Sequence, residues 1–587
     1  MKQFLLTFAA VILAAIFLTL LPFVIISAIA ASSMSEPETM AKPHTIMTLD
    51  LSEAITDRDM DSQIYRVRNA MSGAEGTHGL NTLAKKLEAA ASDDNVVALY
   101  LKGTSASVDA ANMRPLRALI SKFKEESGKP VYFYDEVIGS DKLLYLASAG
   151  DSIFISPEGS VAMYGAIVSK LYFKRIADKF GVGFDVLKHG RYKSAVEPFF
   201  RTSMSDDDKA QSQRIVDVIW AEVRDSIAAS RHVAPERIDE FVDNLQSLTT
   251  RAEDLKQVGL IDNGLYYDQF EEKLAALADC EVKELNFMNI YDLTPTDDNN
   301  NGNKQIAVVY AEGQIFDGSS ESDNENIYAD DLAKTLRKLR MDDNVESVVL
   351  RVNSPGGSAL ASDIIWREVA LLNQQKSVVV SMGGYAASGG YYISCAANYI
   401  YAEPTTLTGS IGVYGMVPNV EKAADNIGVD LDVVGSSKAP IVTGIRALTD
   451  GEKAVLMNSI ERTYKTFVTR VSDGRLMSYE AVDSIGQGRV WMGADAVENG
   501  LVDEIGSLDD AIEAAAGMVA NLGDYEVVEY PEIDDSPLAV LKSLGLSVRA
   551  SVGHYLLGSD FDKFDRVRTQ LQSSPTSVWA ICDTEVR

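Results

Sequence analysis

The residue whose neighbours best suit covalent chemistry is Ser388, which stands in the run Ser381–Tyr392, SMGGYAASGGYY. The small residues around it would leave its hydroxyl unobstructed and let a substrate backbone approach closely. The β-branched run Val378–Val380 precedes this stretch, and a helix-compatible run, Ile393–Ala397, follows it. This order predicts a strand, a tight turn and the start of a helix, with Ser388 at the turn. A turn that only packs, with a serine that caps the helix, fits the same residues equally well.

A serine hydroxyl becomes a strong nucleophile only when a neighbouring base removes its proton, so Ser388 needs a base. The chain has five histidines, and none lies between residues 233 and 553; they are His44, His78, His189, His232 and His554. A histidine triad built within the second half of the chain is therefore excluded. The base must be His189 or a lysine, and a lysine must lie in an apolar pocket or a domain interface to be neutral near pH 7.

Strands and helices alternate along the chain, which predicts βαβ units and a parallel sheet that positions these residues. In the first half, the expected strands are Thr45–Leu51, Val96–Leu101, Pro130–Tyr134, Ser152–Ile155 and Phe184–Leu187, and the expected helices are Ala110–Phe123 and Leu143–Ala149. A second series of the same kind starts after residues 296–303, TDDNNNGN, which have the composition of a linker.

The second series repeats the first. Residues 148–157 match residues 395–404 at an offset of 247, and the blocks 159–165 and 254–262 recur as 409–415 and 495–503. We therefore expect a duplicated domain. The same offset pairs Ser388 with Asp141, and the glycine-rich turn Asn353–Ser358 corresponds to Lys102–Ala106, so the first half lacks both features. Because a fold can form without them, a chemical role for Ser388 is favoured over packing.

The composition excludes several function classes. The chain of 587 residues has a net charge of −31, which argues against nucleic acid or an anionic lipid surface as a partner, since phosphate is bound by Lys and Arg. The three cysteines, Cys280, Cys395 and Cys582, are too widely spaced for a zinc site or a disulfide framework, and we expect Cys395 to be a small buried side chain. No metal cluster, phosphate-binding loop or unfoldase module is recognisable, so we expect no metal, no cofactor and no use of ATP.

Residues 4–31 are almost wholly apolar and long enough to cross a bilayer as a helix. We expect residues 1–31 to be an uncleaved anchor, with the body of the chain on the outer face of an inner membrane, although Ala28–Ala30 also fits a signal-cleavage site. The further expected units are a spacer at 32–43, a first α/β repeat at 44–295, a linker at 296–304, a second α/β repeat at 305–545 and a C-terminal extension at 546–587. The apolar spacing in segments 170–180 and 420–427 predicts helices that pack into a core.

Three motifs resemble those of the signal peptide peptidase A family of serine peptidases, peptidase family S49, in its long, duplicated and membrane-anchored form. They are Asn353–Gly357 (NSPGG), Ser381–Tyr392 and Thr408–Gly412 (TGSIG). The resemblance covers essentially the whole chain and implies tandem α/β domains with parallel sheets and a Clp-protease or crotonase-like fold. It also implies a serine–lysine dyad, and the family's lysine motif matches Gly190–Phe199 (GRYKSAVEPF), which makes Lys193 the implied base.

The same resemblance implies further roles and partners. The backbone N–H groups of Gly357 and Gly389 would form the oxyanion hole, and Ser410 would orient the lysine. The implied substrates are hydrophobic fragments of signal peptides, cleaved through an acyl-enzyme on the periplasmic side of a bacterial inner membrane by a homotetramer. A structural role for Ser410 stays open, because its counterpart Ser160 lies in the half without a nucleophile.

The residues alone leave alternatives for the base and for the function. Before the resemblance is considered, Lys193 is not distinguished from Lys170, Lys174, Lys179 or Lys188, and His189 remains a rival. A crotonase-like acyl-CoA enzyme would share the fold but act through an oxyanion hole and carboxylates. A non-catalytic membrane scaffold would explain the anchor and the oligomer, and neither alternative requires Ser388 as a nucleophile.

Overall fold

The computed structural model describes residues 40–58, 77–110, 112–246, 249–294, 304–320, 326–436, 443–531 and 579–581. The expected anchor at 1–31, most of the spacer and the linker, and most of the C-terminal extension fall outside these residues. Among the helices that are described, none is both long and apolar enough to span a bilayer.

The first half contains a six-stranded sheet in which every neighbouring pair runs parallel. Its order is β8-β6-β5-β4-β1-β9, made of β1 (Thr45–Asp50), β4 (Val96–Lys102), β5 (Val131–Asp135), β6 (Ser152–Ile155), β8 (Asn263–Gly264) and β9 (Asn286–Asn289). Buried apolar residues of this sheet pack against the helices that connect its strands, α3 (Leu80–Ser92), α4 (Met113–Ser127) and α5 (Asp141–Ala147). The parallel sheet predicted from the alternating pattern is confirmed, and the helix expected from residue 110 begins at Met113.

The second half contains a larger sheet of the same kind, with the order β19-β17-β15-β13-β10-β21 and with β16 and β20 added beside β15. Its strands are β10 (Lys304–Glu312), β13 (Val345–Ser354), β15 (Ser377–Ala387), β16 (Tyr399–Ala402), β17 (Leu407–Gly409), β19 (Val490–Met492), β20 (Glu504–Ile505) and β21 (Tyr525–Tyr530). Its helices are α12 (Ala329–Met341), α13 (Ala359–Leu372), α14 (Gly389–Ser394), α16 (Asp450–Arg475), α17 (Tyr479–Ile485), α18 (Gly493–Glu498) and α19 (Leu508–Gly517). Within this sheet β19 is antiparallel to β17, whereas the other pairs are parallel.

The two halves repeat one another element by element, so the predicted duplication is confirmed. Helices α3 and α12 have 13 residues each, and the long helices α8 (Asp206–Arg231) and α16 have 26 residues each. The register repeats as well, because Tyr132 lies opposite Ser152 just as Val379 lies opposite Tyr399, at the expected offset of 247. The first half further contains α9 (Pro235–Asp243), α10 (Ala252–Val258), α11 (Tyr267–Leu277) and the short pair β2 (Ala54–Thr56) and β3 (Thr77–Gly79).

A third sheet joins the halves. It has the order β12-β11-β14-β22-β18-β7 and consists of β7 (Gly183–His189), β11 (Ile315–Phe316), β12 (Ile327–Tyr328), β14 (Gly356–Ser358), β18 (Val413–Asn419) and β22 (Trp579–Ile581). The first-half strand β7 pairs antiparallel with β18 along its whole length, from Gly183 opposite Asn419 to His189 opposite Val413. The segment that leads to Lys193 is therefore built into a sheet of the second half.

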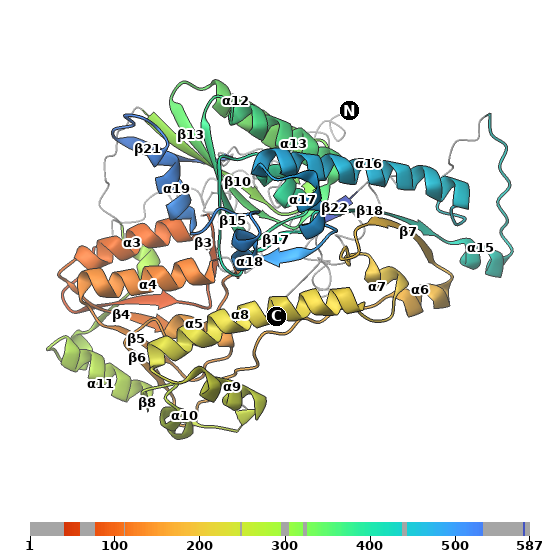
Figure 1. Cartoon of the computed structure of the whole chain (residues 1–587). Helices are drawn as coiled ribbons and strands as arrows, with labels where there is room; N and C mark the ends of the chain where they lie inside the picture. The colour runs from red at the N-terminus through yellow and green to blue at the C-terminus, as the bar shows by residue number, and fades with distance from the viewer. Residues whose placement is uncertain are drawn as a thin grey trace, which may run out of the picture.

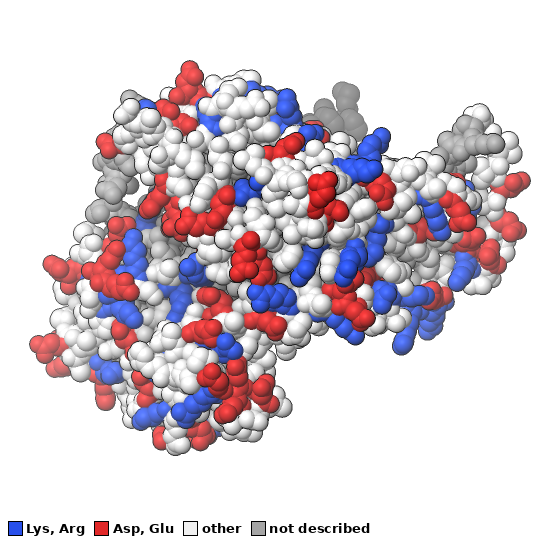
Figure 2. Space-filling model, in the orientation of Figure 1, with Lys and Arg blue, Asp and Glu red and all other residues white. Residues whose placement is uncertain are grey.

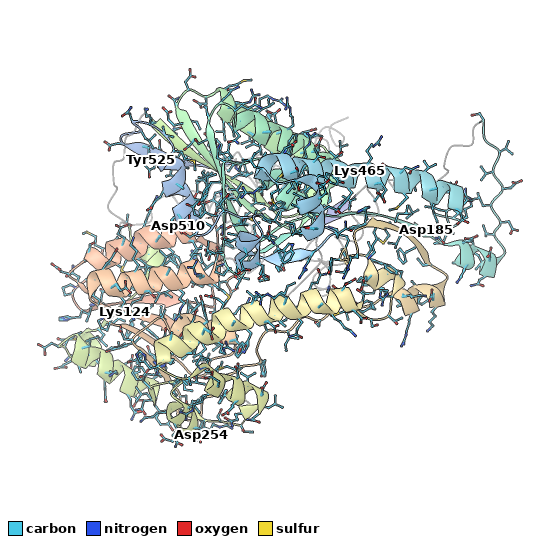
Figure 3. All side chains as sticks on the ribbon, in the orientation of Figure 1. Lys124, Asp185, Asp254, Lys465, Asp510 and Tyr525 are labelled. Atoms are coloured by element: carbon cyan, nitrogen blue, oxygen red, sulfur yellow. The ribbon has the colours of Figure 1, made fainter. Side chains whose placement is uncertain are left out.

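This shared sheet forms the base of an arm on which β7 and β18 run between α8 and α16 and lead to α6 (Lys174–Phe180), α7 (Glu197–Phe200) and α15 (Glu421–Ile427) (Figure 1). Asp185 of β7, labelled in Figure 3 beside the helix that carries Lys465, is buried and accepts a hydrogen bond from the Leu448 N–H at 2.8 Å. Lys453 Nζ lies 2.9 Å from the same carboxylate. Contacts from the second half thus hold β7 in place.

The two apolar segments on the arm do not pack into a core. Helix α6 has no buried residue, and Ile176 and Phe180 are 56% and 64% exposed. Helix α15 buries only Ala424, and Ile427 is 77% exposed. The prediction of core packing is wrong for this chain, because both helices lie at the far end of the arm, beyond the sheets.

Charged residues also join the halves. Arg351 of β13 is buried and makes two hydrogen bonds to the Asp57 carboxylate, at 2.8 and 2.9 Å, while Arg114 of α4 lies 2.9 Å from Glu403. Burial, together with the nearby Asp57 charge, raises the pKa of Glu312 at this junction to about 7. On the face shown in Figure 2, acidic and basic side chains are interspersed.

Candidate active site

Ser388 stands between the end of β15 at Ala387 and the start of α14 at Gly389. The predicted strand, turn and helix are confirmed, but the small residues 381–387 belong to the strand, so the turn is Ser388 itself. Its φ angle of 58° lies in the left-handed region, which is strained for a residue with a β-carbon. Its side chain makes no capping hydrogen bond to the helix. The hydroxyl is therefore available for another partner. The alternative in which Ser388 only caps the helix is not what the structure has.

The residue of the first half that corresponds to Ser388 has an unstrained backbone. Ser140 is the N-cap of α5, as Ser388 is of α14, so the helix caps place Ser140 rather than Asp141 opposite Ser388. The offset of 247 is wrong by one residue here because α5 has seven residues and α14 has six. Ser140 has an ordinary φ of −160°, and its side chain accepts a hydrogen bond from the Leu143 N–H. A serine thus remains in the first half, where it only caps a helix.

Lys193 reaches Ser388 from the first half of the chain. Its Nζ lies 2.7 Å from Ser388 Oγ, 3.0 Å from Ser410 Oγ and 3.2 Å from the Ser410 carbonyl oxygen. All three residues are buried, with 1% or less of each exposed. Burial of an amine disfavours its charged form, because the ammonium loses its hydration. The expectation that the Ser388 hydroxyl is unobstructed is wrong, since Ser388 is fully buried and its hydroxyl contacts Lys193.

The backbone around Lys193 is held by a loop of the second half that the sequence did not single out. The Tyr192 N–H donates to the Gln487 carbonyl oxygen at 3.0 Å. A β-carbon added to Gly488 would lie 2.7 Å from both the backbone nitrogen and the β-carbon of Lys193, so this loop needs a glycine there. Lys188 Nζ donates to the Lys193 carbonyl oxygen at 3.0 Å, and burial lowers the pKa of Lys188. The glycines at 486 and 488 were the one signal in the sequence for this turn.

The rival bases are engaged elsewhere. The His189 ring stacks on Tyr464, and its Nδ1 lies 3.0 Å from Glu461 Oε1. Lys170 pairs with Asp208, Lys174 pairs with Asp178, and Lys179 lies over the ring of Phe180. Of the candidate bases, all of which lie in the described residues, the structure brings Lys193 to Ser388.

The two glycines expected to bind an oxyanion lie in segments that adjoin Ser388. Gly389 is the first residue of α14, where backbone N–H groups have no partner within the helix. Gly357 is buried in β14, and a β-carbon on it would lie 1.9 Å from the Ile315 carbonyl oxygen. Gly390, next in α14, faces the Ser354 carbonyl oxygen, which a β-carbon would approach to 2.5 Å. Close backbone contact therefore fixes α14 against the segment that leads into β14.

One extended strand separates β14 from β18. Strand β22 pairs antiparallel with β14, Gly357 opposite Ala580, and meets β18 where Tyr414 lies opposite Trp579. Buried Val196 and Tyr414 form an apolar cluster beside this position, with Val186, Ala195, Phe200, Phe316 and Met416 packed against them. The space between the two strands therefore has the width of one extended chain.

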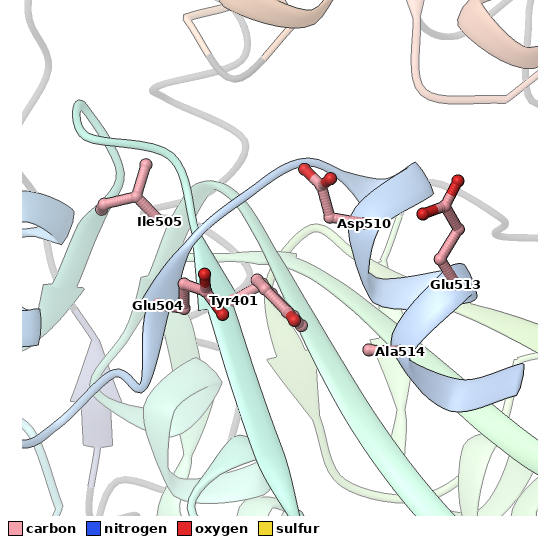
Figure 4. Close-up of a pocket in the computed structure, with 6 residues that line it drawn as sticks. All are labelled: Tyr401, Glu504, Ile505, Asp510, Glu513 and Ala514. Carbon is pink, nitrogen blue, oxygen red and sulfur yellow. The ribbon is translucent and has the colours of Figure 1, made fainter. Parts of the chain in front are cut away.

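A separate surface pocket of about 340 Å³ lies between β16, β20 and α19 (Figure 4). It is lined by Tyr401, Glu504, Ile505, Asp510, Glu513 and Ala514. Glu504 already accepts a hydrogen bond from the Tyr399 hydroxyl, and Asp510 accepts from the Ser507 N–H. In the described part of the chain, no group of three or more His, Cys, Asp and Glu residues is arranged to hold a metal ion. Cys395, as expected, is fully buried, and burial raises the pKa of its thiol.

Two family profiles and several named relatives match the chain. The profile of Peptidase family S49 matches residues 123–281 and 370–521, and that of Clp protease matches residues 298–425. The chain is 35% identical to Protease 4 of Salmonella typhi, over 86% of this chain and 83% of that protein. It is 39% identical to Protease 4 of Haemophilus influenzae, over 70% of this chain and 68% of that protein. The solved structure of ClpP1 from Listeria monocytogenes, 20% identical, covers 35% of this chain and 94% of its own with a TM-score of 0.23.

Proposed function

The chain belongs to peptidase family S49 and is a serine protease, and on this basis we propose that Ser388 is its nucleophile and Lys193 its general base. The observation that carries the proposal is the distance of 2.7 Å between Lys193 Nζ and Ser388 Oγ, two residues that are 195 positions apart in the chain. Because the chain is a serine protease, the acyl-CoA enzyme and the non-catalytic scaffold are set aside.

In the proposed reaction, the neutral amine of Lys193 removes the proton of Ser388 as Oγ attacks a peptide carbonyl carbon. The resulting ammonium remains next to the carbonyl oxygen and the hydroxyl of Ser410, at 3.2 and 3.0 Å, which accept its hydrogen bonds. It then gives the proton to the leaving amine, and an acyl-enzyme on Ser388 remains. Lys193 next activates a water molecule, which releases the acyl group. In this scheme Ser410 orients the lysine.

The negative charge of the tetrahedral intermediate needs donors that are in place before the reaction. We assign this role to the backbone N–H groups of Gly357 and Gly389. The assignment is supported by the free donor position at the start of α14 and by the close packing of that helix against the residues before β14. Neither N–H group depends on a side chain, so the donors are as rigid as the sheet.

The substrates we propose are extended hydrophobic peptides, in particular fragments of signal peptides. Support comes from the position between β14 and β18, which β22 of this chain occupies as a single extended strand and beside which apolar residues cluster; a substrate strand would take the place of β22. A peptide bound there would form backbone hydrogen bonds like those of a sheet, which tolerate many sequences, and the apolar side chains would favour hydrophobic ones. Gly357 would then lie in register with the substrate residue at the cleaved bond.

We also propose that residues 1–31 anchor the protein in the inner membrane of a bacterium, with the catalytic body on the periplasmic side. The support is the apolar run at 4–31. The family resemblance implies a homotetramer, and the exposed apolar side chains of the arm support self-association, because a soluble surface rarely leaves a large apolar patch uncovered. No ATPase is part of this scheme.

The test is a comparison of four variants with the wild type, using a fluorophosphonate probe that labels reactive serines and a quenched hydrophobic peptide. We expect Ser388→Ala to lose all labelling, and Lys193→Met to lose cleavage by about 10²–10⁴-fold, the usual contribution of a general base. His189→Ala and Lys174→Met should cleave at the rate of the wild type. Loss of activity in His189→Ala together with retained activity in Lys193→Met would refute the dyad.

A further inference from the structure

One buried side chain, Gln211, contacts the residues that flank the proposed base, and through β19 and β17 it is linked to the backbone of the proposed nucleophile. Gln211 lies on α8 and is 4% exposed. Its Nε2 donates to the Tyr192 carbonyl oxygen at 3.3 Å and to Ser194 Oγ at 3.0 Å. These two residues flank Lys193 in the chain, so the amide holds the lysine segment on both sides of the base.

The other end of the same amide reaches the second half of the chain. Gln211 Oε1 accepts a hydrogen bond from the Val490 N–H at 3.4 Å. Val490 belongs to β19 and lies opposite Gly409 of β17. The Gly409 carbonyl oxygen accepts a hydrogen bond of 2.8 Å from the Ser388 N–H, and Ser410 follows directly. The Gln211 side chain therefore connects the segment around Lys193 to strands β19 and β17, and β17 is the strand that binds the backbone N–H of Ser388.

The orientation of the amide is fixed by a charged neighbour. Gln211 Nε2 also lies 3.0 Å from Asp208 Oδ1, so its two hydrogens are shared among three acceptors, and Lys170 Nζ lies 2.6 Å from the same Asp208 oxygen. A carboxylate paired with a lysine only accepts hydrogen bonds, so the NH₂ group of Gln211 must face Asp208 and the lysine segment. The Oε1 atom then faces Val490. Asp208 and Lys170 are themselves almost fully buried, which holds this arrangement rigid.

We propose that Gln211 is a positioning residue for the reaction, which sets the distance between Lys193 Nζ and Ser388 Oγ by joining the two halves next to the site. The inference rests on the proposed serine–lysine dyad. The two members of the dyad belong to separate parts of the fold, so their distance depends on contacts across the junction. A misplacement of about 1 Å at a reacting pair reduces the rate by about 10²-fold, which makes such a contact important for catalysis.

The experiment replaces Gln211 by methionine, which has a similar length and volume but no hydrogen-bonding amide. The matched control is Gln213→Met, because Gln213 is exposed on the same helix and its Nε2 donates only to a neighbouring helix residue, Asp217. Turnover is measured per active site, counted with the fluorophosphonate probe. We expect Gln211→Met to lower kcat by about 10–100-fold with KM within about twofold, as expected for lost alignment. The control should match the wild type.

The pH profile separates positioning from general support of the fold. A lysine freed from its brace is better hydrated and harder to deprotonate, so the rising limb of kcat/KM should move to higher pH in Gln211→Met. A variant that is merely less stable would have fewer active sites but the same turnover per site and the same profile. That outcome would overturn the proposal.

A second variant covers the case in which Gln211→Met does not fold. Ser194→Ala removes one acceptor of the amide and should by itself lower kcat in the same direction by a smaller factor. If Gln211→Met folds, the two losses in the double variant should be less than multiplicative. Unchanged turnover in Ser194→Ala would count against the proposal. Lys193→Met is measured alongside: if it keeps its activity, the dyad itself has failed, whereas an inactive Lys193→Met with a normal Gln211→Met refutes Gln211 alone.

Discussion

Alanine at position 488 should disable the enzyme by displacing the lysine rather than by unfolding the protein. Gly488 has a φ of +77°, and its missing β-carbon would lie 2.7 Å from the backbone nitrogen and the β-carbon of Lys193. Lys193 is itself buried, so the new methyl group cannot be accommodated by a shift into solvent. The segment that carries Lys193, the proposed base, must move instead.

The size of the movement follows from these contacts. Ordinary contacts of a β-carbon begin at 3.4 Å, so a contact of 2.7 Å must open by about 0.7 Å. If the amine moves with its backbone, the Nζ–Oγ distance grows from 2.7 Å to about 3.4 Å, which is longer than a hydrogen bond to a hydroxyl. We expect kcat to fall by about 10–100-fold, as for other misplacements of this size. The left-handed backbone adds about 1–2 kcal/mol of strain.

The control separates the displacement of Lys193 by the new β-carbon from the strain of the left-handed backbone. Gly500 has a φ of +82°, and a β-carbon there would have Met477 Sδ at 3.7 Å as its nearest neighbour. Gly500→Ala therefore suffers the same strain without touching the lysine. Peptide cleavage per titrated active site and the thermal midpoint of unfolding should be measured for both variants. We expect reduced turnover per site only in Gly488→Ala, together with a lower midpoint than in Gly500→Ala because of the crowding; equal turnover in both would refute the reasoning.

Three further predictions concern the junction and the arm. Arg351→Met leaves the buried Asp57 carboxylate without its cation and should lower the free energy of unfolding in urea by about 3–5 kcal/mol; a loss under about 1 kcal/mol would contradict this. The pKa of Glu312, raised from 4.5 to about 7, means that the folded state binds the extra proton, so stability falls as pH rises through this window. Glu312→Gln should match the wild type near pH 4.5 and be more stable above pH 7 by about 1–2 kcal/mol, since the side chain is partly exposed; the opposite trend in thermal midpoints would refute it. Replacing Ile176 and Phe180 on the arm by Asp should reduce the oligomer mass in light scattering, and an unchanged mass would exclude α6 from the interface.

Much of the local structure around Ser388 could be predicted from the sequence, because short-range patterns determine it. The valines of β15, the small residues after them and the helix start at Gly389 are signals within a dozen residues of one another. The duplication added an internal comparison, and it was accurate for strands, whose register repeats. It failed by one residue at the start of α5, because a helix can lose a residue at its cap without disturbing the sheet.

The pairing of Lys193 with Ser388 could not be derived from the residues without the family resemblance. It depends on β7 leaving its own half to pair with β18, and nothing in the strand-like residues Phe184–Leu187 indicates which sheet they join. The roles of Gln211 and Gly488 are hidden for the same reason, since both act on the lysine from positions that are distant in sequence. The exposure of α6 was not predicted, because apolar spacing indicates that a helix has an apolar face but not which part of the protein covers that face.

Because β7 pairs within a sheet of the second half, the parts of the proposed site become available in a fixed order during synthesis of the chain. A ribosome completes Lys193 well before Ser388, and β18 and β19 emerge later still. Domains generally fold as they emerge, N-terminal part first. The nascent chain therefore contains Lys193 before Ser388 has been added. It then contains Ser388 before strands β18 and β19 have been made. A chain that stalls or is truncated before β19 lacks a strand that supports the proposed site, so the chain must extend past β19 before that site can form.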